Sequence, residues 1–351
     1  MMYYPRMKAA VLETINAPLA VVDVGLGALS SGQVLVKILV SGICGAQLQE
    51  IAGNKGNAKF VPHLLGHEGC GIVEDVGPDI TRVKKGDKVI LHWRKGDGIE
   101  SGFPTYTYKG KSMPSGKVTT FSEYSIVSEN RITPVSSDTP NDLCALLGCG
   151  LSTALGTIEN EAKVRPGESV MIVGQGGLGA CLIKAARIAG ANPIIAIDIH
   201  DKKDIAASLG AQLFINGATQ NIGETLKNAL GIKEVNVIVE TSGNVDSIRD
   251  TLPLLAGGGR YIMVGQLPPG ASIEVTNANH LFGGEGKMIK ATQGGAFSPT
   301  KDIPRYVQMY RDGKLNTDNL ITHRTSLDKI NDAITLMRYG KASRIMIDIQ
   351  N

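Results

Sequence analysis

Two cysteines and one histidine have side chains that together could bind a metal ion. Cys44 lies in the stretch SGICGAQLQEIAG, His67 precedes Glu68 in LLGHEGCG, and Cys149 lies in LLGCGLSTALG. Two thiolates and an imidazole suit Zn²⁺, which in catalytic sites keeps three protein ligands and one open position, and they do not suit Mg²⁺ or Ca²⁺. The alternative is that the cysteines are small buried core residues. The glycines beside them favour a metal site, because they leave room for an ion and a substrate.

A glycine-rich run, GQGGLG, is a candidate dinucleotide site. It follows an apolar stretch at 169–173 and precedes a run with the helical spacing of apolar residues. Its glycines allow a tight turn, a close approach of backbone to pyrophosphate, and packing of helix on strand, and the helix N-terminus faces the phosphates. The alternative is an ordinary strand, turn and helix. The run comprises Gly174, Gln175, Gly176, Gly177, Leu178 and Gly179.

One acidic residue indicates which dinucleotide is bound. Asp198 ends the next apolar stretch, 19 residues after Gly179. At that place a carboxylate bonds the ribose 2′-hydroxyl and repels a 2′-phosphate. The sequence therefore predicts NAD rather than NADP.

The elements that must position these residues change character near residue 150. Residues 7–135 contain short apolar runs broken by glycine and proline, which predicts a β-rich barrel or sandwich. After residue 150, apolar strands alternate with helical patterns, which predicts a parallel, doubly wound sheet. The polar stretch 94–118 fits neither pattern, and loops of that length are more often functional or partly disordered than structural.

Composition excludes several classes of function. The chain has 351 residues, of which 20% are charged, and a net charge of +3 with no block of like charges. Nucleic acid and membrane surfaces are therefore poor partners. The chain has no apolar run of about 18 residues and no signal-peptide core at its start, so a cytoplasmic location is expected. The five scattered cysteines indicate reduced thiols rather than a disulfide framework.

The motifs, taken in order, resemble those of the zinc-dependent medium-chain dehydrogenase/reductase superfamily, of the alcohol dehydrogenase type. They are GICG, GHEGCGIVEDVG, VKKGDKVI, LGCGLSTALG, VGQGGLG, DIPRYVQMYRDGKL and HRTSLDKINDAITLMRYGKASRIMI. The resemblance implies an α/β protein with two domains around a cleft that holds zinc and NAD. A GroES-like β-rich catalytic domain would comprise residues 1–150 and 294–351, and a Rossmann NAD-binding domain with a doubly wound parallel sheet would comprise 151–293.

The resemblance also implies roles for individual residues. Cys44, His67 and Cys149 match the ligands of one catalytic zinc, and Glu68 matches an acid that can approach the metal. Trp93 matches a residue of the substrate pocket. Four residues match positions that contact the cofactor: Thr153 near the nicotinamide, Asp198 and Lys203 at the adenosine ribose, and Arg344 at the pyrophosphate.

The sequence departs from the family pattern in three places. The stretch 94–118 lacks the four cysteines of a structural zinc, so none is expected there. Ala46 replaces the Ser or Thr that takes the alcohol proton, and Gln49 stands where a relay histidine can be. Gln47 replaces an aspartate that bonds the ligand histidine. A neutral amide can orient the ring but donates less charge, so the metal should be a stronger Lewis acid.

We therefore expect hydride transfer between NAD and an alcohol or carbonyl compound bound at zinc. The proton needs another route, for which His92, Glu68 and a hydroxyl of the substrate are candidates, although His92 could instead be a solvated or core-edge side chain. A polar substrate, such as a polyol or sugar derivative, would suit His92, Trp93, Arg94 and Lys95.

Two alternatives remain open. One is an enzyme that recycles bound NAD in a net elimination or epimerisation, and the other is a non-catalytic NAD-binding protein. We expect a homodimer or homotetramer.

Overall fold

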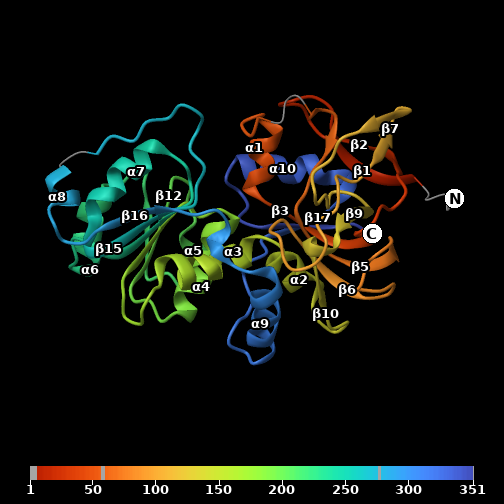
Figure 1. The fold of residues 1–351 in the computed structure, drawn as a ribbon. Helices are drawn as coiled ribbons and strands as arrows, with labels where there is room; N and C mark the ends of the chain where they lie inside the picture. The colour runs from red at the N-terminus through yellow and green to blue at the C-terminus, as the bar shows by residue number, and fades with distance from the viewer. Residues whose placement is uncertain (1–5, 57–59, 276–277, 351) are drawn as a thin grey trace. The chain divides into compact units, whose positions relative to one another are not determined.

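The computed structural model describes residues 6–56, 60–275 and 278–350, and the chain divides into two compact units. Unit 1 comprises residues 1–150, 298–317 and 321–351, and unit 2 comprises residues 151–297 and 318–320. The chain thus leaves unit 1, builds almost all of unit 2, and returns (Figure 1).

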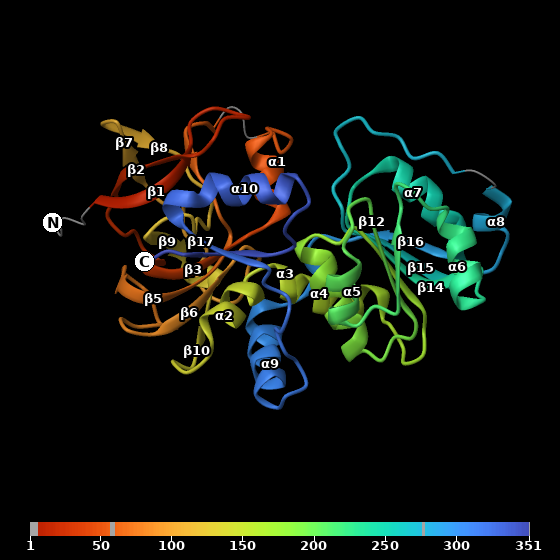
Figure 2. The same ribbon diagram turned by 180° about the vertical axis from the view of Figure 1, so that it is seen from behind.

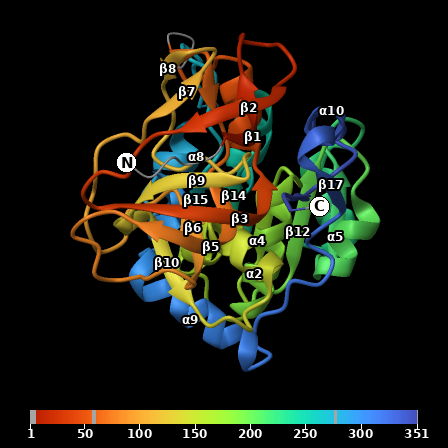
Figure 3. The same ribbon diagram turned by 90° about the vertical axis from the view of Figure 1, so that its right-hand side faces the viewer.

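Unit 1 contains two sheets, whose strands are seen in Figure 3. The first has the strand order β4-β1-β2-β7-β8. The second has the order β10-β6-β5-β3-β18-β17, and β9 also pairs with β3. The strands of the first sheet are β1 (Arg6–Leu12), β2 (Ala20–Leu26), β4 (His63–Leu64), β7 (Tyr106–Tyr108) and β8 (Lys111–Met113). Those of the second are β3 (Gln33–Ile43), β5 (Glu68–Val76), β6 (Lys88–His92), β9 (Tyr124–Ser128), β10 (Ile132–Val135), β17 (His323–Ser326) and β18 (Ile345–Asp348).

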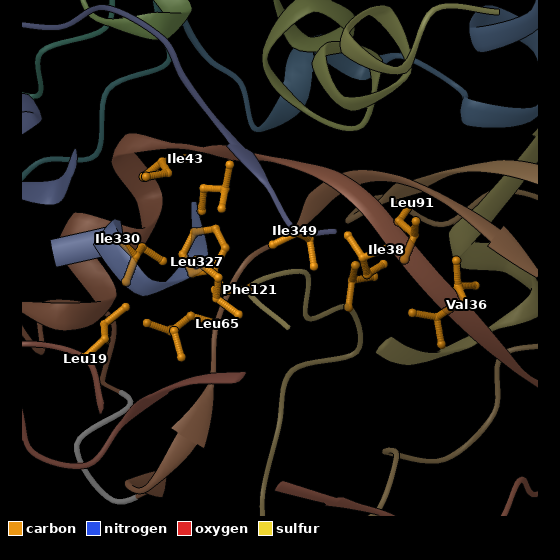
Figure 4. Packing of buried hydrophobic residues seen from close by; sticks show 14 of the residues in the cluster. Leu19, Val36, Ile38, Ile43, Leu65, Leu91, Phe121, Leu327, Ile330 and Ile349 are labelled. Carbon is orange, nitrogen blue, oxygen red and sulfur yellow. The ribbon is translucent and has the colours of Figure 1, made fainter. Parts of the chain in front are cut away.

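One of the core clusters of unit 1 is built mainly by apolar residues of the second sheet and of the helices and loops that cover it. β3 reads QVLVKILVSGI and is buried along nearly its whole length, as expected of a central strand with neighbours on both edges. Figure 4 shows Phe121 and Leu327 side by side in this core, although they lie far apart in the sequence. The helices of unit 1 are α1 (Gly45–Ile51), η2 (Glu129–Arg131), α2 (Asn141–Leu147), α9 (Pro299–Arg311), η6 (Leu327–Lys329) and α10 (Ile330–Arg338).

The stretch 94–118 is ordered by pairing and by charge. It contains β7 and β8, and β7 extends the first sheet by pairing with β2. The fully buried Tyr106 accepts a hydrogen bond from the Ile126 N–H at 2.9 Å. The Glu100 carboxylate lies 3.0 Å from Arg131 Nη2 and 3.6 Å from Lys117 Nζ. Most of this stretch therefore belongs to the scaffold of unit 1.

Unit 2 is a parallel sheet of six strands in the order β13-β12-β11-β14-β15-β16. From β11 the chain moves outward to β12 and β13, and then continues in the other direction from β14. Because such crossovers are right-handed, α4 and α5 cover one face and α7 the other (Figures 1 and 2). The strands are β11 (Val170–Val173), β12 (Ile194–Asp198), β13 (Leu213–Asn216), β14 (Val235–Glu240), β15 (Leu255–Met263) and β16 (Met288–Ala291). The helices are α3 (Gly150–Gly156), the π-helix η3 (Thr157–Ala162), α4 (Gly177–Ile188), α5 (Lys203–Leu209), α6 (Ile222–Leu230), α7 (Val245–Thr251), η4 (Leu252–Leu254), α8 (Ala278–Phe282) and η5 (Gly294–Ala296).

The predicted fold class is confirmed: one unit is β-rich and the other is a doubly wound parallel sheet. In the described ranges no single helix is long and apolar enough to cross a membrane, although Asn141–Leu147 and Gly150–Ala162, which are bent relative to one another, pass that test when taken together.

Candidate metal centre and dinucleotide site

The three predicted metal ligands converge in unit 1. The ligand atoms of Cys44, His67 and Cys149 all lie within 4.8 Å of one another, and no other such group occurs in residues 6–56, 60–275 and 278–350. Cys44 follows β3, and His67 immediately precedes β5. Because these two strands pair with Ser41 opposite Gly69, their ends bring the two ligands together. Cys149 follows α2, a helix that packs on both strands.

The chemistry of this group fits a zinc ion. His67 Nε2 is buried, and Gln47 engages the other ring nitrogen, Nδ1, so Nε2 is the ring atom left to face a cation. The pKa of the Cys44 thiol is held well below its ordinary value, chiefly by a hydrogen bond from Cys149. A thiolate is the form of cysteine that binds metal. Three ligands of type S, N and S leave one position for another molecule, as in catalytic zinc sites.

Gln47 connects two of the ligands. It is 1% exposed and lies in the first turn of α1. Its Oε1 accepts a hydrogen bond from the Cys44 N–H at 3.0 Å, and its amide nitrogen lies 2.5 Å from His67 Nδ1. The predicted contact to the histidine is therefore present, and the contact to the Cys44 backbone was not expected from the sequence.

Glu68 forms a buried ion pair with Arg344. Glu68 Oε1 lies 2.7 Å from Arg344 Nη1, and the two side chains are 0% and 2% exposed. Glu68 Oε2 accepts a hydrogen bond from the Gly150 N–H at 3.2 Å. Burial raises the pKa of the Glu68 carboxyl, and Arg344 opposes that shift. Glu68 does not belong to the group of three close ligands, so its predicted approach to the metal remains a prediction.

Glycines enclose this ion pair. A Cβ on Gly42 would lie 2.6 Å from Glu68 Oε1, and a Cβ on Gly150 would lie 1.5 Å from Arg344 Nη2. The backbone of Arg344 is held by Thr322, whose hydroxyl donates to the Arg344 carbonyl at 3.0 Å. No sequence pattern pointed to Thr322, because its contacts depend on the parallel pairing of β17 with β18.

His92 is a core residue in this structure. It is 0% exposed. Its Nδ1 lies 2.7 Å from the Arg94 carbonyl and its Nε2 lies 2.9 Å from Thr133 Oγ1. Burial lowers the pKa of His92 to about 4. With both ring nitrogens engaged inside unit 1, this geometry favours the structural alternative for His92 over a role in proton transfer.

The other predicted pocket residues lie beside His92 in the sequence. The indole N–H of Trp93 is buried without a hydrogen-bond partner among the described residues, and the Arg94 guanidinium lies 5.6 Å from the centre of the indole ring. Lys95 is largely solvated, with its Nζ 3.8 Å from Glu100. Trp93 and Arg94 therefore remain candidates for contact with a substrate.

The glycine run of unit 2 has the geometry of a dinucleotide loop. It follows the carboxyl end of β11, where the strand order reverses and ligands bind in such sheets. Gly174 has φ +89°, which favours glycine, and a Cβ on Gly179 would lie 1.9 Å from the Gly174 carbonyl oxygen. A Cβ on Gly176 would meet no described atom within 4 Å, so this loop is open at the position where pyrophosphate would approach. Gly177 and Leu178 begin α4.

Asp198, one of the two residues predicted at the adenosine end of the cofactor, contacts this loop. The Asp198 carboxylate accepts hydrogen bonds from the N–H groups of Gln175 at 2.6 Å and His200 at 2.8 Å. Lys203 is exposed, whereas the preceding Lys202 is buried. Burial lowers the pKa of Lys202, and the nearby Asp198 carboxylate opposes part of that shift. No sequence pattern pointed to Lys202. At the predicted nicotinamide end, Thr153 Oγ1 is buried without a partner among the described residues.

Comparison with known proteins agrees with this geometry. Residues 30–137 match the alcohol dehydrogenase GroES-like domain and residues 177–311 match the zinc-binding dehydrogenase family. The chain is 32% identical to an S-(hydroxymethyl)glutathione dehydrogenase of Paracoccus denitrificans, over 97% of this chain and 99% of that one.

Solved structures are similar over nearly the whole chain. An alcohol dehydrogenase zinc-binding domain protein from Burkholderia ambifaria has a TM-score of 0.89 and 26% identity, over 99% of both chains. Benzyl alcohol dehydrogenase from Acinetobacter calcoaceticus has a TM-score of 0.87 and 27% identity, over 99% of this chain and all of the other. With its cysteine–histidine–cysteine group, this chain belongs to the zinc-dependent medium-chain dehydrogenase family and is an alcohol dehydrogenase-like oxidoreductase.

Proposed function

We propose that the protein interconverts a polar alcohol and its carbonyl compound by hydride transfer with NAD at a single zinc site. The convergence of Cys44, His67 and Cys149 within 4.8 Å carries this proposal. Zinc bound there would act as a Lewis acid on the substrate oxygen. Cys44 and Cys149 would balance the charge of a bound ion as thiolates, Gln47 holds His67, and the ion pair of Glu68 with Arg344 adds no net charge beside it.

NAD is proposed over NADP because of Asp198. Its carboxylate lies at the end of β12 and is held by N–H groups of the glycine loop and of His200. A second negative charge from a 2′-phosphate would be repelled there. We expect Asp198→Ser to raise the KM for NAD and to narrow the preference for NAD over NADP. An unchanged ratio of kcat/KM for the two cofactors would show that Asp198 does not determine the preference for NAD.

The proposed substrate class is a small polar alcohol, such as a polyol or sugar derivative. A polar substrate is supported by the positive charge of the Arg94 guanidinium, which lies beside the ring of Trp93, the residue predicted to line the substrate pocket. The relatives carry names for other substrates, namely S-(hydroxymethyl)glutathione and benzyl alcohol. These substrate classes can be compared by measuring NAD reduction by the zinc-loaded protein. The compounds would be polyols, sugars, sugar phosphates, aromatic alcohols and thiol-bound hydroxymethyl groups. Greater activity on benzyl alcohol than on every polar alcohol would reject the polar class.

A second candidate function follows from Ala46 and His92. Ala46 offers no hydroxyl for proton transfer, and both ring nitrogens of His92 are engaged. An enzyme that oxidises and re-reduces one substrate on bound NAD could return the proton within that substrate. The measurement is NADH release during turnover. Stoichiometric NADH supports the dehydrogenase, whereas turnover with catalytic NAD and no net NADH supports elimination or epimerisation.

We also propose that the protein is a homodimer joined along β16. This strand is at the edge of the parallel sheet, and all four of its residues are exposed, including Met288 at 50% and Ile289 at 43%. Exposed apolar edge strands readily pair with another chain. Sedimentation velocity should give a dimer for the wild type and a monomer for Met288→Arg. A wild-type monomer at micromolar concentration would reject the proposal.

A further inference from the structure

We infer that Gln47 weakens metal binding at the site it organises, and that a carboxylate at this position would strengthen it. This inference rests on the proposed zinc site. It concerns the polarity of two hydrogen bonds, and both are defined by the position of the Gln47 amide.

The orientation of the amide is set by the helix start. Cys44 is the N-cap of α1, and Gln47 is the third residue of the helix. Its side-chain oxygen reaches back to the Cys44 N–H at 3.0 Å, which is the capping-box arrangement of a Gln or Glu at this position. Because the amide oxygen of Gln47 accepts the hydrogen bond from the Cys44 N–H, the NH₂ group of the same amide faces His67.

The NH₂ group imposes a tautomer on the ring. An amide nitrogen only donates, so His67 Nδ1, 2.5 Å away, must accept. A neutral imidazole carries one proton, which is then on Nε2. Nε2 is also the ring atom left for the metal, since it is buried, Nδ1 is engaged by Gln47, and the other side-chain hydrogen bond of the ring is to Cys44, itself a proposed ligand. The hydrogen bond to Gln47 therefore favours the ring form that cannot bind an ion through Nε2.

Metal binding creates a conflict that an amide cannot resolve. When Nε2 binds the ion, Nδ1 carries the proton and points it at the NH₂ group of Gln47. If the amide turns over, its NH₂ group instead faces the Cys44 N–H. In both arrangements two donors oppose one another in a buried place. A glutamate has the same length and two acceptor oxygens, so it can accept from the Cys44 N–H and from Nδ1–H together.

The test is Gln47→Glu in the full-length chain, with zinc affinity measured by competition against a chelator. We expect the variant to bind zinc roughly 10–100-fold more tightly, the range typical of changes to partners of ligand histidines. The visible spectrum of the Co²⁺-loaded protein, a readout of ligand geometry, should keep its shape. The matched control is Gln49→Glu, which adds the same charge to an exposed position of the same helix and should leave the affinity unchanged.

Two results would overturn the inference. The first is Gln47→Glu binding zinc no more tightly than Gln49→Glu, the outcome expected if Gln47 only caps the helix. The second comes from ¹⁵N NMR of the metal-free wild type at a pH where the His67 ring is neutral, which keeps the test valid even if the variant misfolds. We expect the proton on Nε2, and a proton on Nδ1 would contradict the reasoning. A wild type that holds no zinc at all would instead reject the proposed metal site itself, and the inference with it.

Discussion

Replacing Arg344 by methionine should destabilise unit 1 strongly, because it leaves a carboxylate in the interior without its counter-charge. Glu68 is 0% exposed, and its Oε1 lies 2.7 Å from the guanidinium. Among the residues that the structure describes, the carboxylate would keep a hydrogen bond from the Gly150 N–H at 3.2 Å. Methionine is unbranched and apolar, so it occupies part of the same space without charge.

The expected magnitude follows from the distance and the burial. With an effective dielectric constant of about 20, two unit charges 2.7 Å apart attract by about 6 kcal/mol. Desolvation of both groups offsets part of this. Removal of one member of a buried pair typically costs about 3–5 kcal/mol, and we expect Arg344→Met to fall in that range. Glu68→Gln should also destabilise, since it leaves the arginine buried and charged.

The assay is urea unfolding of the metal-free protein, followed by tryptophan fluorescence. The chain has one tryptophan, Trp93, which lies in unit 1 and reports on that unit. The double variant Glu68→Gln/Arg344→Met removes both charges, so it should lose less stability than the sum of the single variants, by about 0.5–3 kcal/mol. Arg311→Met is the matched control, because its pair with Asp138 is exposed and solvent screening leaves it little effect on stability.

Two outcomes would refute this reasoning. One is a loss of stability in Arg344→Met no larger than that in Arg311→Met. The other is strict additivity in the double variant, which would mean that the two charges contribute independently rather than as a pair.

Three further predictions concern other contacts. Arg260 lowers the pKa of the Glu168 carboxyl in the folded protein below the pKa in the unfolded chain. The ion pair therefore stabilises the protein above about pH 4.3, the pKa of an unfolded glutamate. This stabilisation is lost as the pH falls through the lowered pKa of the folded state. In calorimetry, Glu168→Gln should therefore lower the Tm at pH 7, and the difference in Tm between wild type and variant should become smaller below pH 4. An equal difference in Tm at both pH values would contradict this. A Cβ on Gly150 would lie 1.5 Å from Arg344 Nη2, so Gly150→Ala should displace the arginine and reduce both the zinc content and the Tm. A variant with wild-type zinc content and Tm would show that the start of α3 or the arginine can move aside without loss. His92→Ala should reduce stability and leave the pH profile of kcat unchanged between roughly pH 5 and 9, because the His92 pKa is about 4; an altered profile would return His92 to the proton path.

The sequence was sufficient to predict features that depend on residue type and local spacing. The glycine run reads as a strand, turn and helix because its neighbours have the matching periodicity, and the structure has β11, the loop and α4 there. The grouping of Cys44, His67 and Cys149, which are distant in sequence, was a weak signal by spacing and could be predicted because the motifs around them resemble those of the family. Unit 2 could be recognised from the alternation of strands and helices.

Contacts made by strand pairing across long sequence distances could not be predicted. The pairing of Arg344 with Glu68, 276 residues away, depends on β18 lying beside β3. His92 was considered for chemistry because it precedes Trp93, yet its burial is set by the pairing of β6 with β5 and β10. The stretch 94–118 looked irregular because its two strands have only three residues each, too few to show a period.

The placement of β18 has a consequence for biosynthesis. This strand pairs with both β3 and β17 in the second sheet of unit 1. During translation, the strands of the parallel sheet emerge together between residues 170 and 291 and can pair while the ribosome is still at work. Unit 1 must wait for an ordering step that joins residues some 300 positions apart, a slow kind of step because the loop to be closed is long. A nascent chain cut short before Ile345 would carry all three metal ligands and every strand of the parallel sheet, and would still expose the edge of β3 on which its second sheet is completed.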